Sequence, residues 1–318
     1  MRSGIGRPGL SCDLPHRCAT YVAAEYLASD NRRYRRVVRI VRQKDYQLSA
    51  VLEKHSGVDG PPPIRDRSRN VRRRAVGRRG IDMVRRRRPL TDTVYLELHG
   101  GALVFGGDDA CRHGARVQAD QLRLTVWSID YRLPPEHRFP AALNDCMTVY
   151  RAALSHHAPR RIVVGGRSAG GNLAAAMLLR AKAEGLPMLA GLVLLSPEVD
   201  LTESGDSFAV NAGVDVMLPG SLMANNRLYA GGADLADPYL SPLFGDVTGF
   251  PPTFLLTGTR DLFLSNTVRM HRRLLTAKVP AELHVFEAMP HGGFGGSPED
   301  REAAREVTRF VHKRLSLV

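Results

Sequence analysis

The chain has 318 residues, enough to bury a large core as one domain or as one domain with a cap. Its apolar share of 43% is ordinary for a globular protein, and apolar runs such as residues 188–195 are far shorter than the roughly 18 residues a membrane span needs. The four cysteines are too few and too scattered for a disulfide scaffold or a zinc cluster, so we expect free thiols in a reducing cytoplasm. We predict no membrane span, no metal and no cofactor.

The net charge of +13 comes from one end of the chain. Residues 1–90 contain 23 Lys and Arg against 8 Asp and Glu, a balance of +15, whereas the remaining residues have a balance of −2. A domain that binds nucleic acid usually has a cluster of basic residues on its own surface. We therefore expect no nucleic-acid partner for the part of the chain after residue 90.

Residues 1–90 form an atypical arginine-rich segment. Apolar positions within residues 19–55 are compatible with cap helices, and residues 56–90 carry arginine clusters with too few apolar residues for a buried strand, so we expect them to be poorly ordered. Three interpretations stay open: translation from a displaced start or frame, a disordered basic arm, or a patch for anionic membranes or nucleic acid. The first interpretation is excluded if the upstream DNA has a single open reading frame and that frame encodes only this arginine-rich segment.

Residues 91–318 alternate between strand-like and helix-like stretches. This alternation predicts an α/β protein, with a mainly parallel central sheet flanked by helices. A Gly-, Pro- and Asp-containing interruption at about residues 198–250 predicts a cap insertion, with a short helix near residues 221–229. The expected strands are 93–98, 124–129, 161–164, 190–195, 253–257 and 282–286, and the expected helices are 140–154, 169–183, 265–278 and 298–315.

Ser168 is the candidate nucleophile. It lies in Gly-Arg-Ser-Ala-Gly at residues 166–170, between an expected strand and an expected helix. Gly-x-Ser-x-Gly is common by chance, but two glycines in a tight strand-to-helix turn leave a serine hydroxyl exposed above the sheet. The context therefore favours a nucleophilic serine.

Asp261 and His291 are the candidate partners of Ser168. His291 lies in a Pro- and Gly-containing turn after the last expected strand, where a plain surface histidine is the alternative. Asp261 follows the strand at residues 253–257, where an N-cap for the next helix is the alternative. The order Ser168, Asp261, His291 favours a triad in which His291 is the general base and Asp261 orients it.

A glycine-rich turn follows the strand at residues 93–98. Backbone N–H groups of Gly100, Gly101 and Ala102, together with the N–H of Ala169, can form an oxyanion hole beside Ser168. An ordinary glycine turn is the alternative for this segment taken alone.

Three linked stretches resemble the hormone-sensitive-lipase-like branch of the α/β-hydrolases, a bacterial family IV type of carboxylesterase. They are HGGALVFG at residues 99–106, DYRLPPEHRFPAA at residues 130–142 and GRSAGG at residues 166–171. The resemblance covers roughly residues 93–315. It implies an α/β-hydrolase fold with a helical cap, and carboxylesterase activity toward short- or medium-chain acyl groups.

The sequence also departs from this family's pattern. Ala102 stands where a third glycine is usual, although only a backbone N–H is needed there, and Arg167 replaces the common aspartate or threonine. Glu198 stands where an aromatic residue is common, and an ion pair between Arg167 and Glu198 is one arrangement that these changes allow. We assign Arg167, Glu198 and Phe105 as candidate substrate-binding residues.

The function predicted from the sequence is a serine carboxylesterase that acts through an acyl-enzyme on a small-molecule ester. A lactone or acetyl-ester hydrolase would use the same triad, and a non-catalytic small-molecule receptor on the same fold is a further alternative. Receptors of this kind typically lose a triad member, whereas all three candidates are present here. A homodimer is the assembly that we consider alongside a monomer.

Overall fold

The computed structural model describes residues 69–76, 79–86 and 92–317, the first two ranges by their backbone alone. The predicted cap helices at residues 19–55 lie outside the described residues. The strands are β1 (Arg69–Val76), β2 (Arg79–Arg86), β3 (Val94–Leu98), β4 (Thr125–Ile129), β5 (Ile162–Arg167), β6 (Gly191–Leu195), β7 (Thr253–Gly258) and β8 (Ala281–Phe286). The helices are α4 (Asp108–Leu122), α5 (Ala141–His156), α6 (Ala169–Ala183), α7 (Ser207–Val210), α8 (Met223–Ala230), α9 (Leu264–Thr276) and α10 (Pro298–Arg314), with short 3-10 turns at Pro159–Arg161 and Pro242–Phe244.

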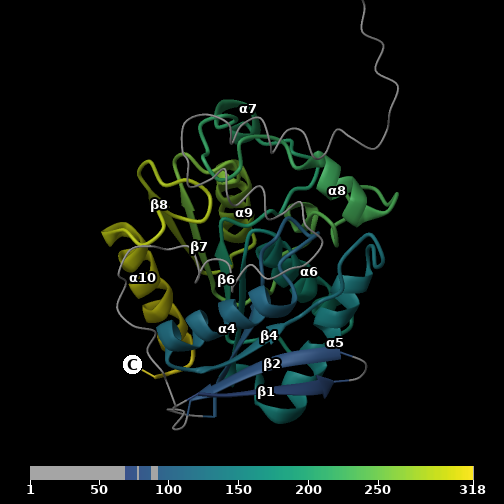
Figure 1. The fold of residues 1–318 in the computed structure, drawn as a ribbon, viewed down its shortest axis with the longest axis vertical. Helices are drawn as coiled ribbons and strands as arrows, with labels where there is room; N and C mark the ends of the chain where they lie inside the picture. The colour runs from purple at the N-terminus through teal and green to yellow at the C-terminus, as the bar shows by residue number, and fades with distance from the viewer. Residues whose placement is uncertain (1–68, 77–78, 87–91, 318) are drawn as a thin grey trace, which may run out of the picture. The chain divides into compact units, whose positions relative to one another are not determined.

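A single sheet organises the domain (Figure 1), with strand order β1-β2-β4-β3-β5-β6-β7-β8. All pairings from β4 to β8 are parallel, which confirms the predicted mainly parallel sheet. The central strands β5, β6 and β7 are buried almost throughout because helices cover both faces. Parallel strands place their carboxyl ends at one edge, where loops that follow them can build a site.

The two strands at one end of the sheet correct a prediction. We expected the arginine clusters of residues 56–90 to form no strand, yet β1 and β2 pair antiparallel, and β2 pairs antiparallel with β4. β1 ends the sheet, and charged residues are tolerated and even favoured in edge strands because they discourage further pairing. β2 lies between β1 and β4, and its sequence includes the apolar residues Ile81, Met83 and Val84 among its charged ones.

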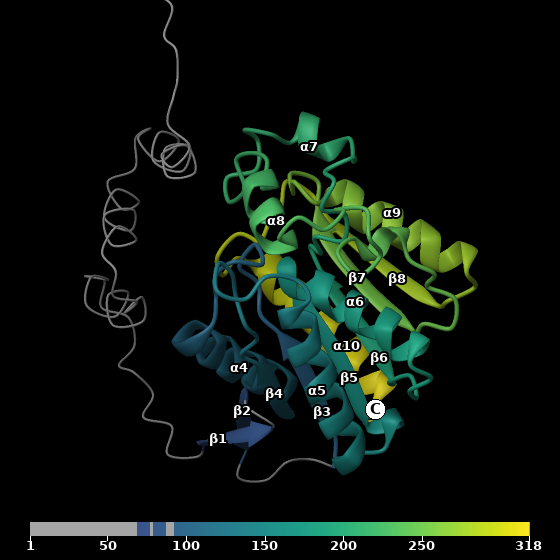
Figure 2. The same ribbon diagram turned by 90° about the vertical axis from the view of Figure 1, so that its right-hand side faces the viewer.

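Two apolar cores lie on opposite faces of the sheet. One contains the buried residues of α5 and α6 with Met270 and Leu274 of α9, and the other contains the buried residues of α4 and α10. Figure 2 shows α5 and α6 on the near side of the strands and α10 behind them. No helix within the described ranges combines the length and the apolar character that crossing a membrane requires.

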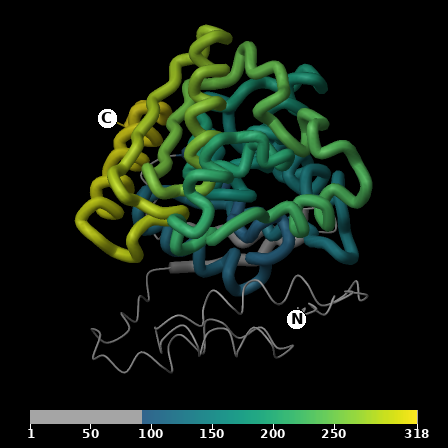
Figure 3. Tube along the Cα trace, turned by 90° about the horizontal axis from the view of Figure 1, so that it is seen from above, coloured from purple at the N-terminus to yellow at the C-terminus, as the bar shows by residue number. Residues whose placement is uncertain are grey.

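The segment at residues 198–250 is held against the carboxyl end of the sheet. It contains α7 and α8, of which α8 confirms the predicted short helix, joined by turns. The side chain of Asn211 donates a hydrogen bond to the backbone of the loop after β7. The side chain of Asp215 accepts hydrogen bonds from the backbone of the loops after β7 and β8. Viewed from above (Figure 3), this segment (green) lies beside those loops (yellow-green).

Candidate active site

Ser168 lies in the turn between β5 and α6, the context predicted for it. Its backbone has φ 57° and ψ −124°, a conformation that costs a non-glycine residue about 1–3 kcal/mol. The neighbouring glycines permit this turn: a Cβ added to Gly166 would lie 2.4 Å from the carbonyl carbon of Gly170, and one added to Gly170 would lie 1.9 Å from the Leu98 oxygen. The Gly-x-Ser-x-Gly spacing therefore reflects close backbone contact.

Asp261 and His291 form a buried pair. The His291 ring donates from Nδ1 to Asp261 Oδ1 over 3.1 Å, and Asp261 also accepts from the Thr257 hydroxyl and the Phe263 N–H. Burial alone would raise the pKa of Asp261, but the hydrogen bond from His291 and its charge hold that pKa below its ordinary value. An ionised Asp261 fixes the His291 ring with Nε2 as its unprotonated nitrogen, which is the tautomer a general base needs.

The three candidates follow β5, β7 and β8 and therefore lie at the same edge of the sheet. The structure brings Asp261 and His291 into direct contact. No hydrogen bond among the described residues joins the Ser168 hydroxyl to His291. Ser168 is 6% exposed and His291 9% exposed, so both are largely shielded from water.

The loop after β3 supplies backbone donors next to Ser168. A Cβ added to Gly100 would lie 3.6 Å from Ser168 Cβ, which places this glycine against the nucleophile. The loop turns sharply through Gly101 (φ 128°) and Ala102 (φ 49°). None of the hydrogen bonds within the described part of the chain uses the N–H of Gly101, Ala102 or Ala169. These N–H groups are thus available for an oxyanion.

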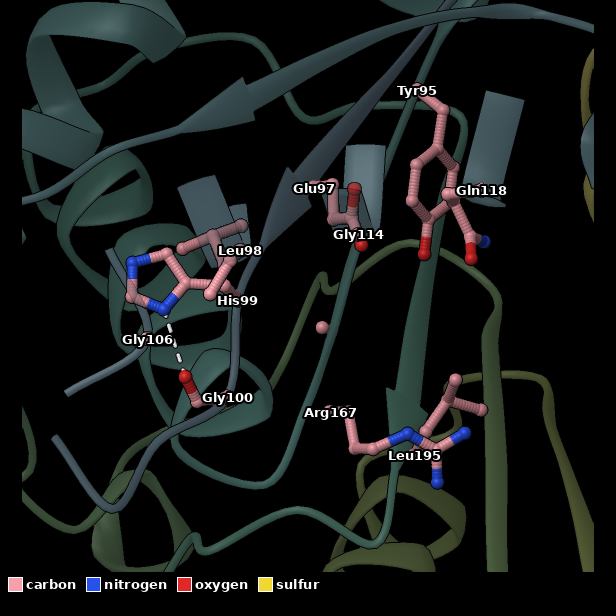
Figure 4. Close-up of a pocket in the computed structure, with 12 residues that line it drawn as sticks. Tyr95, Glu97, Leu98, His99, Gly100, Gly106, Gly114, Gln118, Arg167 and Leu195 are labelled. Atoms are coloured by element: carbon pink, nitrogen blue, oxygen red, sulfur yellow. Dashed lines mark hydrogen bonds between the residues drawn. The ribbon is translucent and has the colours of Figure 1, made fainter. Parts of the chain in front are cut away.

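His99 holds this loop from behind. Its ring stacks on Tyr131 with centroids 4.0 Å apart, and the Tyr131 hydroxyl donates to the His99 carbonyl over 2.8 Å. The His99 ring in turn donates from Nδ1 to the Gly100 carbonyl over 2.8 Å (Figure 4). Burial lowers the pKa of His99 and favours the neutral ring.

Arg167 points into a pocket of about 260 Å³ between β3, β5 and α4 (Figure 4). Its side chain is exposed to solvent in the pocket, and partial desolvation lowers the pKa of its guanidinium. Glu97 lines the same pocket, and burial raises the pKa of its carboxyl to about 7, a shift that Arg167 partly opposes. The pocket therefore holds two ionisable side chains and lies next to the turn that carries Ser168.

The other two candidate substrate-binding residues, Glu198 and Phe105, do not line the pocket around Arg167. Glu198 is 1% exposed, and burial, together with the charge of Glu203, raises the pKa of its carboxyl to about 8. No ion pair joins Arg167 to Glu198 in the described ranges, so the pairing considered from the sequence is not formed. Phe105 follows the glycine turn and is 51% exposed.

Two polar residues from the segment at 198–250 were missed by sequence analysis. The Asp215 carboxylate accepts the N–H of Leu262 over 2.8 Å and the N–H of His291 over 3.2 Å, although it lies 76 positions from His291. The Asn211 amide donates to the Asp261 carbonyl over 2.8 Å. Both residues are buried, so the insertion fixes the backbone on either side of the Asp261–His291 pair. Their four-residue spacing in a loop gave no motif to recognise.

Residues 95–294 match a family model described as alpha/beta hydrolase fold. The match covers more than half of the chain, so the chain belongs to the α/β-hydrolase family. This confirms the fold class predicted from the alternation of strands and helices.

Comparisons with individual proteins narrow the assignment. The chain is 32% identical over 224 residues to an esterase of Acinetobacter venetianus, which covers 69% of this chain and 74% of that relative. The crystal structure of esterase E25 matches with a TM-score of 0.76 at 32% identity and covers 98% of each chain. An esterase from the bacterial hormone-sensitive lipase family matches with a TM-score of 0.73 at 33% identity, over 79% of this chain and 86% of the other. Within its family the chain belongs among the carboxylic ester hydrolases of the hormone-sensitive-lipase branch, as the sequence resemblance implied.

Proposed function

We propose that this chain is a serine carboxylesterase with Ser168, His291 and Asp261 as its catalytic triad. The observation that carries the proposal is the placement of Ser168 in a strained turn against Gly100, at the sheet edge that also holds the hydrogen-bonded pair of Asp261 and His291. A serine hydroxyl, a histidine with a fixed tautomer and unused backbone N–H groups are the parts that ester hydrolysis requires.

The proposed reaction has two halves. His291 Nε2 removes the proton of the Ser168 hydroxyl as its oxygen attacks the ester carbonyl, and the N–H groups of Gly101, Ala102 and Ala169 stabilise the resulting oxyanion. His291 returns the proton to the departing alcohol, which leaves an acyl group on Ser168. Water, deprotonated by the same ring, then attacks the acyl-enzyme and releases the acid. Asp261 stays ionised throughout and stabilises the imidazolium form of His291.

The proposed substrates are small esters with short or medium acyl chains. The family resemblance supports this range, and the buried, compact surroundings of Ser168 and His291 favour small acyl groups.

The test is hydrolysis of p-nitrophenyl esters from acetyl to palmitoyl by the chain and by its Ser168→Ala variant. Loss of an activated nucleophile is expected to lower kcat by roughly 10⁴-fold or more. Equal rates for the two proteins would refute the triad. Activity confined to long acyl chains would replace the esterase proposal by a lipase, and a matching series of lactones separates ester from lactone hydrolysis.

A further inference from the structure

Three side chains with metal-binding atoms gather behind the loop at residues 99–106. His99 follows β3, Asp130 follows β4, and Cys111 lies in the first turn of α4. Because β3 and β4 are parallel neighbours, their carboxyl ends meet at this point. The ligand atoms of His99, Cys111 and Asp130 all lie within 4.8 Å of one another.

The His99 ring is already oriented as a metal ligand. A carbonyl oxygen can only accept, so the contact with Gly100 requires a proton on His99 Nδ1 and leaves the lone pair on Nε2. His99 is 9% exposed, and Nε2 is buried without a hydrogen-bond partner among the described residues. Leaving such an acceptor unpaired costs about 1–3 kcal/mol. Ligating histidines usually donate their other ring N–H to a carbonyl or carboxylate, as His99 does (Figure 4).

The other two side chains also have supporting contacts. Cys111 is fully buried, and its Sγ lies 3.1 Å from the Ser128 hydroxyl. Asp130 is half-buried and accepts the N–H of Asp108 over 3.0 Å. Such outer contacts orient metal ligands, and the partial exposure of Asp130 gives an ion a route to the cluster.

We propose that His99, Cys111 and Asp130 form a Zn²⁺ site, with a water molecule as the fourth ligand. Nitrogen, thiolate and carboxylate oxygen are all zinc ligands, at about 2.0–2.3 Å from the ion, so atoms within 4.8 Å of one another reach a shared ion after a small inward movement. The Cys111 thiol releases one proton to solvent as the Zn–S bond forms. The thiolate and the Asp130 carboxylate then balance the charge of the ion in this buried place. The site does not depend on the proposed esterase activity, and it revises the expectation of no metal.

The test uses Co²⁺ as a coloured substitute for Zn²⁺ in the full chain with Cys12→Ser and Cys18→Ser, so that Cys111 and Cys146 are the remaining thiols. Titration of the metal-free protein is expected to saturate at one Co²⁺ per chain, with visible bands and a thiolate-to-cobalt charge-transfer band in the near ultraviolet. Added Zn²⁺ should abolish these bands. A folded chain that shows no saturable charge-transfer band overturns the proposal.

Cys111→Ser and Cys146→Ser are matched variants for this experiment, because both cysteines are buried and neither forms a disulfide. Cys111→Ser should remove the charge-transfer band and Cys146→Ser should retain it, with folding checked by far-ultraviolet circular dichroism. Asp130→Asn should weaken Co²⁺ binding by at least about tenfold, and it replaces the Cys111 comparison if that variant does not fold. A band that survives in Cys111→Ser, or Co²⁺ affinity unchanged in Asp130→Asn, contradicts the site.

Discussion

At the scale of single residues, Glu198 is a carboxylic acid held neutral by its surroundings. Its pKa of about 8 compares with an ordinary value of 4.5, and burial is the main cause. Between these two pH values the unfolded chain loses the proton while the folded chain keeps it. The stabilisation is fully present below about pH 4.5 and is lost as the pH rises to about 8, an effect on the order of 5 kcal/mol.

Glu198→Gln is therefore expected to make stability less dependent on pH. The amide is uncharged in both states, so the variant should lose less of its free energy of unfolding than the parent between about pH 5 and about pH 8. The measurement is Tm across this pH range. Glu136→Gln, at an exposed position, is the control and should follow the parent. The same pH slope in Glu198→Gln and in the parent would show that burial does not perturb Glu198.

At the scale of elements, the segment at residues 198–250 reaches across to the loops after β7 and β8. Asp215 is its main link, because one carboxylate accepts the N–H groups of both Leu262 and His291. This makes Asp215 a positioning residue for the Asp261–His291 pair, because its bonds to Leu262 and His291 are to their backbone N–H groups. These two bonds fix the backbone on either side of the imidazole.

Asp215→Asn is expected to lower kcat by about 10–100-fold with little change in KM, because the amide offers a single acceptor oxygen and a small displacement of a catalytic group is costly. The measurement is steady-state kinetics with p-nitrophenyl acetate at several pH values. Asp237→Asn is the matched control: that carboxylate also accepts a backbone N–H, from Tyr239, within the same segment. If Asp215→Asn lowers the free energy of unfolding but leaves kcat unchanged, Asp215 has only a structural role.

The elements also show what the sequence could and could not predict. The six parallel strands were recognisable as short apolar runs, because burial on both faces selects such residues. Helix α4 was missed because its buried face is made of small residues, Cys111, Ala115 and Ala119, which give little apolar contrast. β1 and β2 were missed because their arginines interrupt any apolar run, although charged residues are tolerated in an edge strand such as β1.

Some residues of the candidate site could likewise be predicted from the sequence and others could not. Ser168, Asp261 and His291 each follow a recognisable strand, so their order along the chain was readable. Asp215 acts through backbone atoms far away in the sequence, and such a contact leaves no local pattern. The unformed pair of Arg167 and Glu198 has the same origin, since the sequence does not show that Arg167 is exposed in a pocket while Glu198 is buried.

At the scale of the whole molecule, α10 packs against α4 on one face of the sheet. Gln121 of α4 donates to the Ala304 carbonyl of α10, and the His312 ring of α10 lies 2.8 Å from the Leu122 carbonyl of α4. Phe310 is 2% exposed and packs on Phe254 of β7, with ring centroids 5.5 Å apart. The core on this face therefore depends on the last helix.

Phe310→Ala is expected to destabilise the domain by about 3–5 kcal/mol, which corresponds to a fall in Tm of roughly 10 °C. Trp127 is the single tryptophan and belongs to the core on the opposite face, so its fluorescence reports whether both faces unfold together. Fluorescence and circular dichroism should give the same lowered Tm. Phe294→Ala, at a position 42% exposed, is the control and should change stability by less than about 1 kcal/mol. A Trp127 transition that stays at the parental temperature would mean that the two cores unfold independently.

The turn that carries Ser168 has one further consequence. Gly166 and Gly170 are fixed by backbone atoms that any side chain would strike, whereas Arg167 between them extends into an open pocket. Position 167 is therefore suited to redesign. Its side chain can be exchanged, reversed in charge or chemically labelled, while Gly166 and Gly170 maintain the geometry of the turn around Ser168. Substitutions at position 167 are also a route by which the substrate preference of this chain can change in evolution.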